Sequence, residues 1–268
     1  MNIFLAVHSA SLIEISWTIL FCAVIAAYVL AVFRSNRTYK PWPMRRTLCW
    51  IAGMACALAA VVGPIAQRGH EDFVYHMVGH LLLGMLAPLL LVLAAPMTLV
   101  FRTLPVKQAR TLASLLRKSR YVRFVSHPIT ASFLNIGGLW LLYRTPLFHL
   151  MHAHDMLYCI VHIHVFMAGY LFAASMIYID PTPHRYRFLH RAVVFLFALA
   201  GHGILSKLIY ASPPAGVDPV QAKTGAMLMY YGGDLIDFVI ILILFYGWYQ
   251  HKRPSVSALR ASSQSQQS

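Results

Sequence analysis

Two histidines four residues apart, His76 and His80, stand near the start of a long apolar run. On an α-helix, side chains at this spacing leave the same face about one turn apart. A pair of imidazoles presented in this way can bind a metal ion or the iron of a haem. Ionisable groups are costly inside a membrane span and are typical of functional sites there. We therefore predict that His76 and His80 are metal ligands.

Further candidate ligands lie in other apolar runs, and each has a structural alternative. His162 and His164 are two residues apart, so their side chains point about 200° apart on a helix and cannot both face one site. A single histidine such as His202 also serves as a hydrogen-bonding group between membrane helices. The predicted metal ligands are His76, His80, His162, His202 and Met77, with His152 and Asp234 as further candidates.

The residue types around these histidines favour copper. Imidazole nitrogen and thioether sulfur, as in Met77, suit copper and especially Cu(I), whereas Mg²⁺ and Ca²⁺ need carboxylates, which are scarce here. The four cysteines form no C-x-x-C pair, so a thiolate site is not expected. A b-type haem held by two histidines such as His80 and His162 is the alternative. A purely structural role is the alternative for Asp234 and Lys207, because a buried pair of opposite charges also joins two spans.

The composition indicates that membrane helices position these residues. The chain has 268 residues, of which 59% are hydrophobic and only 11% are charged, and its mean hydropathy is +0.63. Soluble domains carry about a quarter charged residues. The net charge of +14 does not indicate a nucleic-acid partner, because the cations stand in short segments between apolar runs.

The apolar runs predict an all-α polytopic membrane protein with seven transmembrane helices. A span needs roughly 20 apolar residues, and the chain shows no alternation typical of a membrane barrel. Pro88 and Pro96 should bend or end the third helix. We expect a single membrane domain over residues 1–250 and a disordered cytoplasmic tail over residues 251–268. The predicted spans are 12–33, 47–66, 75–100, 128–146, 154–178, 191–211 and 225–249.

The basic residues predict the orientation of these spans. All but four of the 22 lysines and arginines fall in residues 34–46, 102–123, 185–191 or after residue 251, which this topology puts on one side. Positive segments stay in the cytoplasm, so the N-terminus is expected outside and the C-terminus inside. Within 102–123, apolar residues recur at helical spacing. We weigh a helix lying on the anionic leaflet against a plain basic loop.

This topology sorts the 14 histidines into two groups. Four of them, at positions 127, 184, 190 and 251, fall at the cytoplasmic surface. The others fall outside the membrane or within the spans, and His80 lies about 6 Å deeper than His76. The third, fifth and sixth spans are therefore expected to bring imidazoles into one layer below the outer surface.

Several motifs resemble those of the multi-span CtaG-type cytochrome c oxidase assembly factors. One is His76-Met77-x-x-His80 followed by leucines, Pro88 and Pro96; another is Gly225-Ala226-Met227-Leu228-Met229-Tyr230 followed by Gly232-Gly233. A third is Gly201-His202-Gly203 leading to Tyr210. The resemblance covers roughly residues 50 to 250. The chain departs from the family at Arg144, where a histidine is expected, and at Gln221-Ala222, where Asp-Gln is expected.

The resemblance implies a non-enzymatic role in maturing a haem–copper oxidase in the inner membrane of a bacterium. The expected cargo is copper, and the expected partner is an oxidase subunit or another copper chaperone. A haem-binding redox protein and a copper transporter are the alternatives. A di-iron hydroxylase is disfavoured. Those enzymes resemble one another in carrying about eight ligands on the cytoplasmic side, whereas the candidate histidines of this chain are predicted to lie toward the outside.

Overall fold

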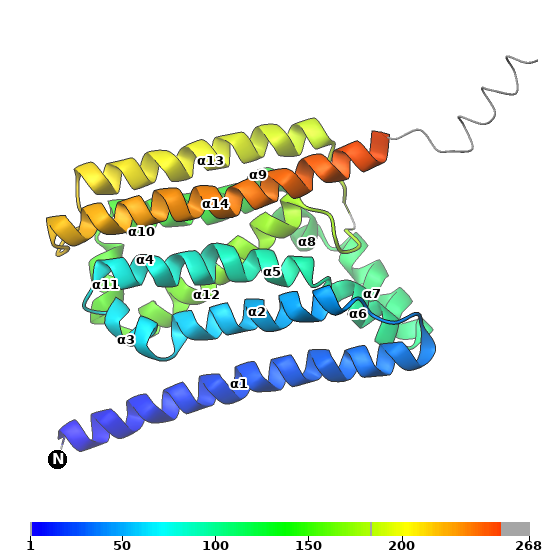
Figure 1. Ribbon diagram of the computed structural model, residues 1–268, viewed down its shortest axis with the longest axis horizontal. Helices are drawn as coiled ribbons and strands as arrows, with labels where there is room; N and C mark the ends of the chain where they lie inside the picture. Colours follow the sequence, from blue (N-terminus) through cyan, green and yellow to red (C-terminus); the bar gives the residue numbers. More distant parts are fainter. Residues whose placement is uncertain (1, 183, 253–268) are drawn as a thin grey trace, which may run out of the picture.

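The computed structural model describes residues 2–182 and 184–252. Within these residues the regular structure is helical throughout, as predicted (Figure 1). The elements are α1 (Asn2–Thr38), α2 (Met44–Val61), α3 (Pro64–Gly69), α4 (Phe73–Leu81), the π-helical turn η1 (Leu82–Leu86), α5 (Ala87–Leu93), α6 (Pro96–Thr103), α7 (Val106–Lys118), α8 (Arg120–Val125), α9 (Pro128–Ser132), the π-helical turn η2 (Phe133–Gly137), α10 (Gly138–Arg144), α11 (Leu147–Ala153), α12 (Asp155–Met176), α13 (Phe188–Ala211) and α14 (Pro219–Lys252).

Six helices in the described residues are long and apolar enough to cross a membrane. They correspond to six of the seven predicted spans and mark an integral multi-pass membrane protein. These helices cover Glu14–Thr38, Met44–Val61, Phe73–Leu93, Asp155–Met176, Phe188–Ala211 and Pro219–Gln250. Most of the predicted tail, from residue 253 onward, lies outside the described residues.

The predicted span 128–146 is helical but shorter than the other six. Here α9, η2 and α10 follow one another without a break from Pro128 to Arg144. Within η2, the carbonyl oxygen of Leu134 accepts a hydrogen bond from the backbone N–H of Gly138 and another from Nε2 of His164, 3.1 Å away. His164 therefore fastens α12 to this segment. Membrane crossing by this segment stays a prediction.

The third span ends before Pro96, as that proline predicted, but it does not end at Pro88. The helix continues through Pro88, because the π-helical turn η1 lies directly before it. This wider turn accommodates the proline ring and the absence of its N–H donor. It then ends at Leu93 rather than at residue 100. Ala95 has φ 54°, in the left-handed region, and Pro96 begins a new helix, α6. The carboxylate of Asp180 accepts hydrogen bonds from the N–H groups of Met97 and Thr98 at 3.0 and 2.7 Å, which fixes the start of α6.

The second span also ends earlier than predicted. We expected residues 47–66, but α2 covers Met44–Val61. Gly63 has φ 91°, which only glycine adopts readily, and Pro64 begins α3. The short helix α3 then packs against α4 and leads the chain into the histidine-bearing segment.

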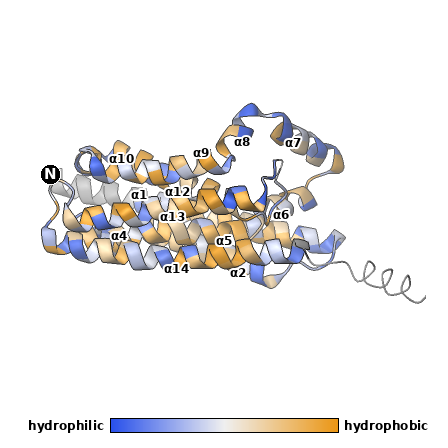
Figure 2. Cartoon of the chain, turned by 90° about the horizontal axis from the view of Figure 1, so that it is seen from above, coloured by the Kyte–Doolittle hydropathy of each residue, from blue (hydrophilic) through white to orange (hydrophobic). Residues whose placement is uncertain are grey.

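The basic segments gather at one end of the bundle, as the topology requires. The α1–α2 connection, helices α6 to α8, the α12–α13 connection and the end of α14 all lie at this end, which we call the basic end (Figure 1). Helix α7 confirms that part of 102–123 is helical rather than a plain loop, and it lies beside the bundle with no buried residue (Figure 2). The other end, formed by α3, α11 and the start of α14, is called the opposite end.

Candidate functional site

The start of α4 is held in place by two polar side chains. Asp72 caps the helix, because its carboxylate accepts a hydrogen bond from the N–H of Val74 at 2.7 Å. The N–H of Phe73 donates to Oε1 of Gln221 at 3.0 Å, which ties the start of α14 to the start of α4. Gln221 is the first residue of the Gln221-Ala222 pair, where the resemblance led us to expect Asp-Gln. These contacts set the direction in which His76 and His80 leave the helix.

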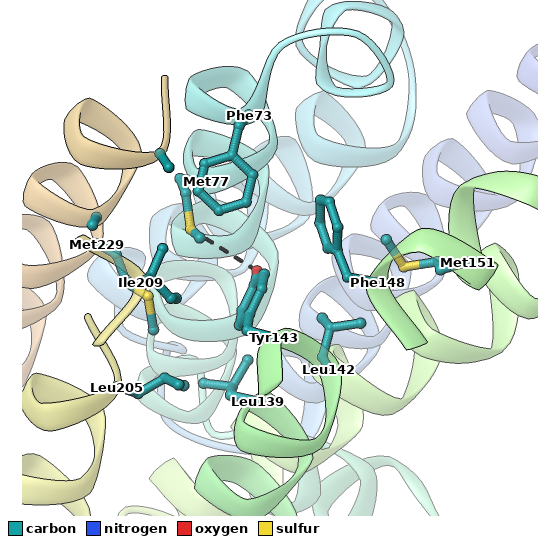
Figure 3. Close-up of a cluster of buried hydrophobic side chains, with 12 residues drawn as sticks. Phe73, Met77, Leu139, Leu142, Tyr143, Phe148, Met151, Leu205, Ile209 and Met229 are labelled. Carbon is teal, nitrogen blue, oxygen red and sulfur yellow. Dashed lines mark hydrogen bonds between the residues drawn. The ribbon is translucent and has the colours of Figure 1, made fainter. Parts of the chain in front are cut away.

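His76 is buried against a tyrosine from another helix. Its Nε2 lies 3.0 Å from the hydroxyl oxygen of Tyr143, on α10. The same hydroxyl lies 3.9 Å from Sδ of Met77, which is fully buried. Tyr143 and Met77 belong to the core cluster that also includes Phe73 and Phe148, and Figure 3 marks the contact between them. Tyr143 thus joins an imidazole and a thioether of the predicted ligand set.

Two half-buried histidines lie beside His76 with defined tautomers. The ring centroids of His152, on α11, and His162, on α12, lie 5.8 and 6.5 Å from that of His76. Nδ1 of His152 lies 2.9 Å from the carbonyl oxygen of Phe148, and Nδ1 of His162 lies 2.9 Å from that of Tyr158. A carbonyl only accepts, so each Nδ1 carries the proton. Each Nε2 is left with a lone pair, as in metal-ligating histidines.

A stack of rings extends from this group to the opposite end. The ring of Tyr158 stacks on that of His162 at a centroid distance of 3.9 Å, and on that of His70 at 4.6 Å. Burial, and then the neighbouring His152, lower the pKa of His70 below its usual range. The residue still has an exposed surface, so this series of rings reaches solvent at the opposite end.

Deeper in the bundle, His80 pairs with His202 on α13. Their rings stack with centroids 6.2 Å apart and an angle of 27° between planes. Nε2 of each is buried without a hydrogen-bond partner in the described structure. Leaving such a group unpaired costs about 1–3 kcal/mol. A small cavity of about 20 Å³ lies beside His80 and is also lined by His76, Tyr143 and His162.

Two glycines make room for the His80–His202 pair. A Cβ at Gly233, on α14, would lie 2.5 Å from Cε1 of His202. A Cβ at Gly84, in η1, would lie 2.8 Å from Val165 and 3.3 Å from Nδ1 of His80. Gly233 therefore lets α14 approach His202 on α13, whereas a Cβ at Gly232 would lie 2.6 Å from Leu81 on α4. This steric requirement gives the motif a physical reason.

Two candidates raised by the sequence, His164 and the predicted ligand Asp234, do not join this group. His164 points to Leu134 instead, as its two-residue separation from His162 predicted. Asp234 lines a different cavity, between α13 and α14, together with Lys207. The ammonium of Lys207 lies 5.3 Å from the ring centre of Tyr230, so its close partner is an aromatic ring. Across residues 2–182 and 184–252, no three His, Cys, Asp or Glu side chains lie close enough together to hold one metal ion.

The structure also places residues that sequence reasoning missed. Tyr143 contacts both His76 and His80, with centroid distances of 6.0 and 6.4 Å. Its partner Met77 was predicted, but nothing in the sequence links Tyr143 to the histidines, because the contact is made between helices. Asp237, one helical turn after Asp234, is buried with only 4% of its surface exposed. The sequence feature that could have identified Asp237 was a carboxylate within the last apolar run.

Residues 26–251 match the family described as the cytochrome c oxidase caa3 assembly factor (Caa3_CtaG). Similar curated proteins are uncharacterized proteins of Mycobacterium bovis and Mycobacterium tuberculosis, each 34% identical over 170 residues, which are 61% of this chain and 26% of the relative. An uncharacterized protein of Mycobacterium leprae is 32% identical over 178 residues, 64% of this chain and 27% of that protein. The chain thus spans about a quarter of the length of these relatives. No solved structure matches.

Proposed function

We propose that this chain, which belongs to the cytochrome c oxidase caa3 assembly factor family, binds copper and delivers it to a haem–copper oxidase. The single observation that carries the copper proposal is the pair of buried, unpartnered Nε2 atoms of His80 and His202. Two neutral imidazoles suffice to coordinate Cu(I), so this pair needs no third ligand. Imidazole without thiolate makes a site that releases its metal, which delivery requires.

The outer histidines serve as the access route in this proposal. His152 and His162 each hold a proton on Nδ1 and keep Nε2 available. His76 lies between them and the deeper pair, with the thioether of Met77 beside it. Copper arriving at His70 would pass nitrogen and sulfur donors along the way inward. Asp234 is not part of this route.

The proposal fixes an orientation and a location. The basic end faces the cytoplasm and the opposite end faces the outside, because positive segments are retained on the cytoplasmic side. The segment Pro128–Arg144 then makes a seventh crossing, which puts the two chain ends on opposite sides. The membrane is the plasma membrane of a bacterium, and the receiving partner is an oxidase subunit or a second copper chaperone. The role is assembly rather than catalysis.

Copper binding by purified full-length protein tests the site. Equilibrium dialysis followed by metal analysis should give about one copper per chain for the wild type. His76→Ala combined with His80→Ala, and His80→Asn combined with His202→Asn, should abolish binding. His164→Gln is the matched control, because this histidine lies on the same helix as His162 but points to Leu134. Full copper retention in both double variants would refute the site.

The alternatives differ in measurable ways. Haem on His80 and His162 would give an intense Soret band, but a cavity of about 20 Å³ has room for a single ion or water and not for a porphyrin. A copper transporter would carry copper into sealed proteoliposomes, whereas a delivery protein would not. In a bacterial host whose own gene for this protein is deleted, the wild-type gene should restore copper in the oxidase. The gene that encodes His80→Asn combined with His202→Asn should not.

A further inference from the structure

A groove opens on the side of the bundle between α13 and α14, apart from the histidine cavity. It has a volume of about 490 Å³, and most of its lining is apolar. Its polar lining residues are Lys207, Tyr230, Asp234 and Asp237. The two helices lie side by side along one face of the bundle (Figure 1). The groove therefore faces the lipid or whatever replaces lipid there.

The carboxyl group of Asp237 is the unexplained feature of this groove. Only 4% of the residue is exposed, and within the described structure the carboxyl group makes no hydrogen bond. Asp237 is 18 residues from the start of α14 and 15 from its end, so it lies about 27 and 23 Å from them, near the middle of the helix. Hydrocarbon chains offer no hydrogen-bond donor to such a group. An acid at this depth is typical of a site with a polar partner.

The one base that lines the groove does not supply that partner. Lys207 lies over Tyr230, seven residues before Asp237 on α14, which places the ammonium about 10 Å nearer the opposite end. It is also only four residues from the end of α13, close enough for its ammonium to reach the membrane surface. Among the residues that line the groove, Asp234 and Asp237 thus have no base at their own depth.

We infer that the groove is the docking site for a transmembrane helix of a partner protein that carries a basic side chain near its midpoint. A lysine or arginine facing Asp237 would supply both the missing donor and the complementary charge. The apolar walls would pack against the rest of that helix, and polar pairs of this kind hold membrane helices together. This inference does not depend on copper binding, since none of these groove residues lines the histidine cavity.

The test measures association between the full-length protein and synthetic helices in liposomes by fluorescence energy transfer. Three polyleucine helices are compared: one with a central lysine, one with leucine throughout, and one with a central glutamate. The lysine helix should associate with the wild type roughly three- to fifteen-fold more strongly than the leucine helix. The glutamate helix should show no such gain.

Variants then assign the effect to the groove. Asp237→Asn combined with Asp234→Asn should abolish the preference for lysine, whereas Asp218→Asn should keep it, because Asp218 lies outside the groove at the start of α14. Copper binding should be unchanged in both the double variant and the Asp218→Asn variant. Equal association of all three helices, as for a groove filled by lipid, would overturn the inference. A lysine preference that survives in the double variant would do the same.

Discussion

The hydroxyl oxygen of Tyr143 lies 3.0 Å from Nε2 of His76, inside the core that joins α4 to α10. This contact occupies a nitrogen that copper would use on its way inward. A net hydrogen bond of about 1 kcal/mol must therefore be broken for His76 to bind metal through Nε2.

Removing that hydroxyl should speed copper uptake and leave the final affinity unchanged. In Tyr143→Phe the ring is kept and the competing hydroxyl is removed, so copper should load about fivefold faster, while unfolding becomes easier by about 1 kcal/mol. The time course of copper loading measures the first effect, and thermal unfolding measures the second. Slower loading would mean that the hydroxyl supports the route instead of competing with the metal.

A methyl group at Gly233 should disturb the deeper pair. Its Cβ would lie 2.5 Å from Cε1 of His202, so the ring or α14 must move. We expect Gly233→Ala to cost about 1–3 kcal/mol of stability through overpacking, and to weaken copper binding. Gly247→Ala on the same helix is the control, since nothing lies within 4 Å of a Cβ there. Equal behaviour of the two variants in thermal unfolding and copper titration would argue against this packing role.

Asp180 should anchor the break after the third span. Its carboxylate accepts hydrogen bonds from two backbone N–H groups and from the hydroxyl of Thr98 at 2.6 Å. Asp180→Ala leaves these donors unpaired and should cost about 1–2 kcal/mol, with Asp180→Asn in between. Thermal unfolding in nanodiscs is the measurement. An unchanged unfolding temperature for the alanine variant would show that α6 starts without this cap.

At the basic end, His127 should make stability depend on pH. Burial, and then the nearby His190, lower the pKa of His127, and Nδ1 of its ring accepts a hydrogen bond from the N–H of Ile129 at 3.2 Å. The unfolded chain binds the proton more readily, so this contribution to stability is present above about pH 6.5 and is lost as the pH falls below it. His127→Asn, which keeps a cap, should flatten this dependence. The same pH profile for both proteins would contradict the assignment.

The sequence predicted the helical class, the gathering of basic segments at one end, and the meeting of imidazoles from different helices. These features follow from local patterns: apolar length, positive segments, and the four-residue spacing of His76 and His80. The opposite directions of His162 and His164 followed from helix geometry alone, and the structure confirms them.

The errors and omissions come from interactions between segments distant in sequence. A π-helical turn lets the helix continue through Pro88, and the local sequence did not indicate this turn. Pro96 did predict a break, but the carboxylate of Asp180 that caps α6 comes from a distant segment. Tyr143 reaches His76 only because α10 packs against α4, and Asp237 differs from Asp234 in burial rather than in type.

X-ray absorption at the copper edge, on full-length protein loaded with one equivalent of Cu(I), tests copper binding by His80 and His202 most directly. The spectrum should show the multiple-scattering pattern of imidazole ligands. This pattern should disappear in His80→Asn combined with His202→Asn and persist in His164→Gln. A spectrum without imidazole scattering, or one unchanged in the double variant, would contradict copper binding at this pair.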